Sequence, residues 1–152
     1  MVSSMARRVQ NNASSNLKGY AFRLRPHEDL KKCIQQFAKT NRLKAGAILS
    51  AVGSVKQLNI RFANQPDGTR ITGFFEIVSL TGTFSETSCH IHICVSDASG
   101  QTLGGHLLDD NLIYTTAEII VVNLYDLEFI RLMDTTYNYK ELVVRRIRKK
   151  RR

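Results

Sequence analysis

The chain lacks tryptophan, has only 2 prolines in 152 residues and contains no long hydrophobic run. Its longest nearly apolar stretches, residues 45–55 and 119–125, fall well short of the roughly 20 residues that a membrane-spanning helix needs. With 43% hydrophobic residues and 9 glycines, the composition also excludes a collagen-like or wholly disordered chain. We therefore expect one soluble domain with no membrane association.

Cysteine is also scarce, and Cys33, Cys89 and Cys94 form an odd number at spacings that fit no disulfide framework. The Ser/Asn-rich residues 1–18 contain two arginines with no apolar segment after them, so they predict a disordered leader rather than a signal peptide. Reduced thiols without a secretory signal favour a nuclear or cytoplasmic location and argue against secretion.

Positive charge is concentrated at the C-terminus. The formal net charge is +9, but residues 1–144 hold 15 basic and 13 acidic residues and so carry only +2. The basic residues of the remaining tail, 145–152, are Arg145, Arg146, Arg148, Lys149, Lys150, Arg151 and Arg152. Such a block repels itself and attracts DNA, another polyanion or a nuclear import receptor. The alternative is a solvated end with no specific partner, and the sequence shows no zinc finger or recognition helix that would read bases.

One amphipathic helix and about seven strands are predicted. Apolar residues at 30, 33, 34, 37 and 38 have helical spacing. Alternating or apolar-rich runs predict strands at 19–25, 47–54, 55–62, 70–84, 89–97, 119–132 and 141–144. The sequence thus indicates an α+β domain over residues 19–144, with a mostly antiparallel sheet packed against one main helix.

Three of the 4 histidines, His90, His92 and His106, lie within seventeen residues. On a strand, His90 and His92 project to one side about 7 Å apart, near enough to share an ion. Gly104 and Gly105 predict a flexible loop that brings His106 back over the strand. Three histidines suit Zn²⁺ or a similar borderline metal and leave a fourth position open to water or substrate. We expect one zinc per chain. The alternative is that all three are surface histidines without a metal.

Nearby residues offer further groups for this site. Cys94 follows His92 by two positions and is the nearest candidate for an added ligand, or it is a small packed side chain. Glu76, Glu86 and Asp97 are candidates for acceptors that orient the imidazoles. Catalytic residues cannot be named, since there is no nucleophile elbow, phosphate-binding loop or dinucleotide fingerprint.

The chain contains four short segments in a specific order: residues 73–82 (GFFEIVSLTG), 90–92 (HIH), 97–100 (DASG) and 104–107 (GGHL). Together they resemble the PPC domain, which is shared by prokaryotic single-domain proteins and plant AT-hook nuclear-localised proteins. The resemblance covers roughly residues 19–145, which is the size of a single domain. It implies an antiparallel sheet packed with a helix, a homotrimer and, as in prokaryotic members, a metal site at the positions of His90, His92 and His106.

The chain departs from the plant members because it has no Arg-Gly-Arg-Pro core of an AT-hook. A·T-specific DNA binding is therefore not implied. Two functions remain open. One is a trimeric binding module with a three-histidine metal site and a basic tail for nucleic acid contact or nuclear import. The other is a zinc-dependent small-molecule enzyme or ligand sensor that uses the open metal position.

Overall fold

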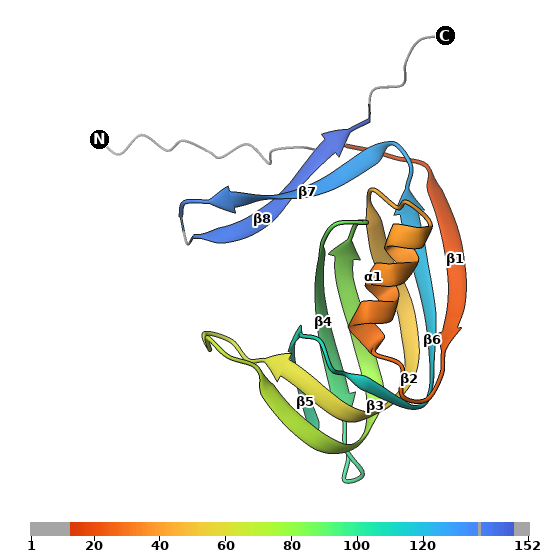
Figure 1. The fold of residues 1–152 in the computed structure, drawn as a ribbon, viewed down its shortest axis with the longest axis vertical. Coiled ribbons are helices and arrows are strands. Elements are labelled where there is room, and N and C mark those ends of the chain that lie inside the picture. Colours follow the sequence, from red (N-terminus) through yellow and green to blue (C-terminus); the bar gives the residue numbers. More distant parts are fainter. Residues whose placement is uncertain (1–12, 137, 148–152) are drawn as a thin grey trace.

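The structure is a computed structural model that describes residues 13–136 and 138–147, and this part of the chain forms eight strands and one helix (Figure 1). The elements are β1 (Leu17–Leu24), α1 (Leu30–Thr40), β2 (Gly46–Arg61), β3 (Thr69–Phe84), β4 (Cys89–Ser96), β5 (Thr102–Leu107), β6 (Leu112–Leu124), β7 (Leu127–Asp134) and β8 (Tyr139–Arg146). A six-stranded sheet has the order β1-β6-β2-β3-β4-β5, and β7 and β8 form a separate hairpin. All strand pairings are antiparallel, as the sequence predicts.

The predicted number of about seven strands is wrong by one. The runs 47–54 and 55–62 form the single strand β2, whereas 119–132 divides into β6 and β7 at a two-residue turn. Gly104 and Gly105, predicted to form a flexible loop, lie in β5. Apolar runs do not reveal where a long strand continues or turns, because that depends on its partners in the sheet.

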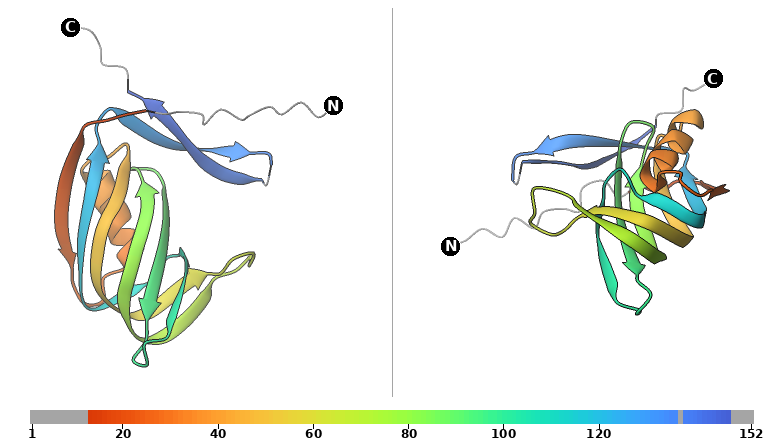
Figure 2. Two further views of the ribbon diagram at one scale, coloured as in Figure 1. Left: turned by 180° about the vertical axis from the view of Figure 1, so that it is seen from behind. Right: turned by 60° about the horizontal axis from the view of Figure 1, so that its bottom comes forward.

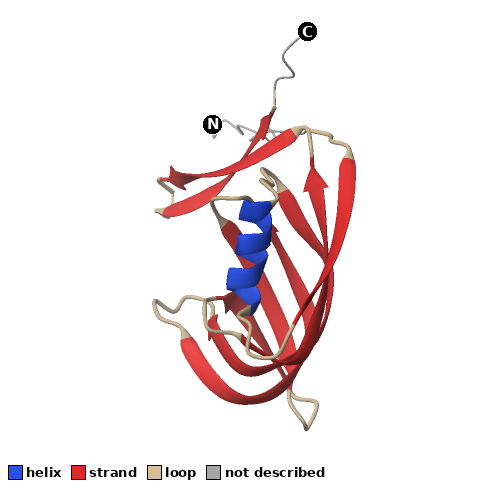
Figure 3. Ribbon diagram, turned by 45° about the vertical axis from the view of Figure 1, so that its right-hand side comes forward, coloured by secondary structure: helices blue, strands red, loops and turns tan. Residues whose placement is uncertain are grey.

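Helix α1 confirms the predicted amphipathic helix. Its N-cap is Asp29, whose carboxylate accepts a hydrogen bond from the backbone N–H of Lys32 at 2.9 Å. The helix lies across one face of the sheet, where it buries Leu30, Ile34 and Ala38 (Figure 3). No helix in the described part of the chain is long and apolar enough to cross a membrane.

The long strand β2 joins two parts of the sheet. Along most of its length β2 lies between β6 and β3, and at its C-terminal end Ile60 and Arg61 pair with Leu107 and His106 of β5. Strands β2, β3, β4 and β5 therefore close on one another, while β6 and β1 continue the open side of the sheet (Figure 2). The core lies between sheet and helix, and its largest fully buried side chains are Phe84, Leu30, Ile34, Leu43, Leu58, Ile60, Ile91, Leu107, Ile113, Ile119, Val55 and Val95.

The hairpin of β7 and β8 projects from one end of the sheet (Figures 1 and 2). Its base is anchored by a small second cluster in which Ala45, Leu127 and Phe129 are buried. The tip of the hairpin extends beyond the sheet on the side where β2 and β3 turn (Figure 1).

Both ends of the sheet-forming chain differ from the expected boundaries. Strand β1 starts at Leu17, inside the expected leader, because its backbone pairs with β6. Strand β8 runs to Arg146, which pairs with Leu127, so Arg145 and Arg146 belong to a strand rather than to a free tail. Residues 1–12 of the expected leader and residues 148–152 of the basic tail lie outside the described residues.

Candidate metal centre

Adjacent strands bring the three histidines together. His90 and His92 lie on β4, and their side chains project to the same side while Ile91 between them is buried in the core. His106 lies on β5 and is the direct partner of His92 in the antiparallel ladder. The predicted grouping of these residues is therefore present in the fold.

The predicted loop origin of His106 is wrong, because the residue is held in a strand. A Cβ atom at Gly104 would lie 2.6 Å from the carbonyl oxygen of Ile93, and one at Gly105 would lie 2.7 Å from that of Arg61. Real Cβ atoms do not approach backbone oxygens so closely, so the two glycines allow β5 to fit between β4 and the end of β2. Close backbone approach, rather than loop flexibility, explains the pair of glycines.

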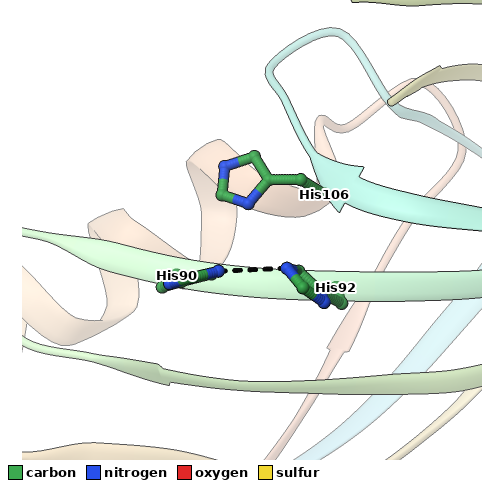
Figure 4. A group of neighbouring side chains, drawn as sticks. All are labelled: His90, His92 and His106. Atoms are coloured by element: carbon green, nitrogen blue, oxygen red, sulfur yellow. Dashed lines mark hydrogen bonds between the residues drawn. The ribbon is translucent and has the colours of Figure 1, made fainter. Parts of the chain in front are cut away.

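The three imidazoles converge on one point (Figure 4). The Nε2 atoms of His90 and His92 are 3.0 Å apart, and one ring nitrogen from each histidine lies within 4.8 Å of the others. Nitrogen ligands on a tetrahedral zinc ion with ordinary bond lengths are roughly 3.3 Å apart. The His90–His92 distance is close to that of two ligands on one ion, and the nitrogen of His106 lies near enough for the group to hold a metal ion.

The burial of His106 favours a ligand at this point. Its Nδ1 atom is buried and has no hydrogen-bond partner among the described residues. Burial, followed by the neighbouring His90 and Arg61, lowers the pKa of His106 from 6.5 to about 4. Burial and Arg131 likewise lower the pKa of His90. Lowered pKa values favour neutral imidazoles at His90 and His106, and the neutral imidazole is the form that coordinates metals.

The other expected members of the site do not join it. Among the described residues, the convergent group of possible metal ligands holds only the three histidines, and Cys94 is outside it. The carboxylate of Asp97 accepts hydrogen bonds from Ser99 and Gln101, and these bonds lower its pKa. It stabilises the turn between β4 and β5. Glu76 and Glu86 make no hydrogen bond to a histidine in the described part of the chain.

A cavity of about 510 Å³ adjoins the histidines and includes residues that no sequence pattern indicates. It is lined by Arg61, Asn64, Cys89, His90, His106, Arg131, Tyr139, Lys140 and Glu141. Its walls come from the end of β2, from the centre itself and from the β7–β8 hairpin. The lining residues from β2 and from the hairpin share no motif with the histidines, so only the fold reveals that they belong to the same cavity.

Hydrogen bonds hold the two arginines of the cavity. From Nη1, Arg61 donates to the carbonyl oxygen of Gln65 at 3.3 Å. Arg131 donates from Nη2 to Oγ1 of Thr83 at 3.2 Å and from Nη1 to the carbonyl oxygen of Lys140 at 3.5 Å. The bond to Thr83 joins the projecting hairpin to strand β3 of the main sheet.

Comparisons with known proteins find a matching family model and similar sequences. Residues 11–125 match the family model described as the Plants and Prokaryotes Conserved (PCC) domain. A curated relative, the bifunctional protein GlmU of Synechococcus sp. (strain JA-3-3Ab), is 39% identical over 145 residues. The match covers 95% of this chain and 23% of the relative, so the chain spans about a quarter of the length of the curated relatives it matches.

Solved structures share the same fold. A hypothetical protein from Salmonella has a TM-score of 0.87 and 34% identity, and the match covers 88% of this chain and 97% of that one. A metal-containing protein from Archaeoglobus fulgidus has a TM-score of 0.75 and 26% identity, with 86% and 96% covered. A protein from Bacteroides thetaiotaomicron described as a candidate DNA-binding protein has a TM-score of 0.73 and 25% identity, with 86% and 98% covered.

Proposed function

The chain belongs to the Plants and Prokaryotes Conserved domain family, the PPC family that its sequence resembles, and from this we propose that it is a homotrimeric binding module. Each chain holds one zinc ion at the three-histidine centre. The basic tail contacts nucleic acid or a nuclear import receptor, and the protein resides in the nucleus or cytoplasm.

The convergence of the histidine nitrogens within 4.8 Å is the observation that carries the metal assignment. His90, His92 and His106 would hold the ion. The Nδ1 atom of His106 is buried without a hydrogen-bond partner, and a coordination bond would either satisfy this atom or fix the ring of His106 through its other nitrogen. Zinc bound by three histidines keeps one open position, where it acts as a Lewis acid toward an oxygen ligand. The similarity to a metal-containing protein supports the same assignment.

An exposed apolar face supports the homotrimer. Helix α1 covers one face of the sheet, and large apolar side chains are exposed on the neighbouring strands β6, β2 and β3. They are Leu49, Val52, Phe74, Val78, Tyr114 and Ile120. The rings of Phe74 and Tyr114 also contact each other, with centroids 4.5 Å apart. Since soluble monomers rarely expose such a surface, association with other copies would bury it.

The charge of the C-terminus supports the contact with a polyanion. Arg145 and Arg146 end the projecting hairpin and are exposed, and the remaining basic residues follow them in sequence. Three tails on one trimer would bind a long polyanion with avidity. The fold is shared with a candidate DNA-binding protein, which is consistent with this role.

Elemental analysis of protein purified without an affinity tag tests the metal centre. The expected result is about one zinc per chain in the wild type, with loss of the metal from His92→Ala. His27→Asn is a matched control, because His27 lies outside the centre and asparagine tolerates its positive φ of 72°. A wild type that stays metal-free after incubation with zinc would contradict the proposal, as would full zinc content in His92→Ala.

The cavity favours a second candidate function, that of a zinc-dependent small-molecule enzyme or ligand sensor. A hollow of about 510 Å³ beside His90 and His106 is large enough for a small ligand and is lined by charged side chains. Comparison of zinc-loaded and metal-free protein in a hydrolysis screen would separate an enzyme from a module that only binds. Turnover that disappears in His92→Ala would favour the enzyme.

A further inference from the structure

The cavity beside the metal centre is rich in positive charge. Arg61, Arg131 and Lys140 line it together with one carboxylate, that of Glu141. The charged side chains of the lining therefore sum to +2, as much as the whole of residues 1–144. A hollow with this excess of positive charge attracts anions.

The two arginines approach the histidines from different parts of the fold. Arg61 is the partner of His106 where β2 pairs with β5, and Arg131 lies on the β7–β8 hairpin. Both arginine residues are half-buried, and each is held by hydrogen bonds to the protein that use only some of its five N–H donors. Two partly desolvated guanidinium groups thus line the same cavity as His90 and His106.

Planar guanidinium groups bind carboxylate and phosphate oxygens through paired hydrogen bonds. A three-histidine zinc ion prefers an oxygen ligand at its open position. We propose that this cavity binds the carboxylate or phosphate group of a small molecule, to which Arg61 and Arg131 donate hydrogen bonds beside the metal centre. This inference rests on the proposed zinc site, and it names the class of ligand that the site takes.

The dimensions and the lining favour a small molecule as the source of the anion. About 510 Å³ is within the usual size of small-molecule sites and accommodates a group larger than a bare oxyanion. The exposed ring of Tyr139 on β8 also lines the cavity, and it offers an apolar surface for the organic part of the ligand.

Calorimetric titration of zinc-loaded protein with inorganic phosphate and, separately, with malonate tests the inference. Arg61→Gln and Arg131→Gln should keep their zinc. Each should bind the anion about tenfold to a hundredfold more weakly than the wild type, because it loses charge-assisted hydrogen bonds to the ligand. Preference for phosphate or for malonate identifies which anion the site takes. Glu141→Gln should tighten binding, since it removes the one negative charge of the lining.

Two controls separate charge recognition from structural damage. Arg25→Gln changes an exposed arginine outside the cavity and should bind as the wild type does. Arg61→Lys keeps the charge but loses the planar fork, so its affinity should fall between those of the wild type and Arg61→Gln. Circular dichroism and zinc content establish that each variant is folded and loaded.

Each outcome is informative about a different claim. Zinc-loaded wild type that binds neither anion would overturn the inference and leave the metal centre standing, as would arginine variants that bind like the wild type. A wild-type protein that holds no zinc would contradict the proposed zinc site instead, and elemental analysis measures the zinc content independently of anion binding. Opposite effects of the arginine and Glu141 substitutions would support the anion site, because a purely structural role gives no such sign reversal.

Discussion

His92 on β4 and His106 on β5 are direct partners in an antiparallel ladder, and their ring centroids lie 5.5 Å apart. The register between two strands therefore determines the distance between two ligands of the candidate metal centre. A shift by one residue would turn His106 to the opposite face of the sheet. The contacts that hold this register consequently control the site.

Gly104→Ala should disturb the centre without changing a ligand. The new Cβ atom would lie 2.6 Å from the carbonyl oxygen of Ile93, so β5 must move away from β4. We expect a loss of about 1–3 kcal/mol in the free energy of unfolding, as for other overpacked sites, together with weaker zinc binding. Urea denaturation and zinc titration measure the two effects.

The matched control is Gly19→Ala in β1, where the added Cβ atom meets nothing within 4 Å. It should match the wild type in zinc affinity. Equal zinc affinity in Gly104→Ala and wild type would contradict the role of close strand packing.

The metal-free protein should lose stability as the pH falls from about 6.5 toward 4. The pKa of His106 is lowered in the folded state from 6.5 to about 4, chiefly by burial, so in this range the unfolded chain binds a proton that the folded chain does not. The contribution of His106 to the free energy of unfolding is complete above pH 6.5. It declines as the pH falls below 6.5, where the histidine of the unfolded chain becomes charged, and it is lost below about 4, where the folded chain is protonated as well. Denaturation in the presence of a chelator, at several pH values, measures the decline.

His106→Gln should reduce that pH dependence, because glutamine does not titrate. Part of the pH dependence will remain, because the pKa of His90 is also lowered. A variant with the same dependence as the wild type between pH 6.5 and 4.5 would show that His106 is not the titrating group.

Removal of residues 148–152 should weaken binding to DNA while leaving the fold intact. Five basic residues are lost, but β8 ends at Arg146 and keeps its pairing with β7. Retention on immobilised duplex DNA at increasing salt is the measurement, and the slope with salt should become shallower. Unchanged retention would contradict a role of the tail.

Removal of residues 145–152 should give a different result. It deletes Arg145 and Arg146 from β8 together with Ile147, whose N–H donates to the carbonyl oxygen of Asp126 at 2.8 Å. This longer truncation should lower the melting temperature as well, whereas the shorter one should not. The comparison separates the charge of the tail from its contribution to the hairpin.

Val52→Glu should dissociate the proposed homotrimer. The side chain of Val52 is 54% exposed on the apolar face, and a charge there would be desolvated on association. Light scattering after size exclusion should give three times 17.2 kDa for the wild type and a lower mass for the variant. Gln36→Glu on the exposed side of α1 is the control and should keep the mass of the wild type. A wild-type mass of one chain would overturn the trimer.

Local patterns in the sequence predict much of this fold. The helical period of apolar residues gives α1, and the two-residue period of a strand places His90 and His92 on one side of β4. The family resemblance is likewise confirmed. These features depend on neighbours in sequence, so no knowledge of the sheet is needed to find them.

Features that depend on distant segments are not predictable in this way. A pair of glycines fits both a flexible loop and a strand in close contact with others, and Gly104 and Gly105 are the second case. Arg61 and Arg131 carry no motif, and they line one cavity with the histidines only because the end of β2 pairs with β5 and the hairpin contributes residues to the same cavity. The role of the glycines and the position of the arginines both depend on the strand topology, which the pattern of apolar residues does not predict.

The closure of β2 on β5 also limits how another protein can reach this site. At His106 the strand has a neighbour on each side, His92 on β4 and Arg61 on β2. No backbone edge is left there for an added strand, so β-augmentation and edge-to-edge aggregation are blocked at the metal centre. The free edge of the main sheet next to β6 belongs to β1, where Lys18 and Arg23 are exposed charges of the kind that discourage unwanted pairing.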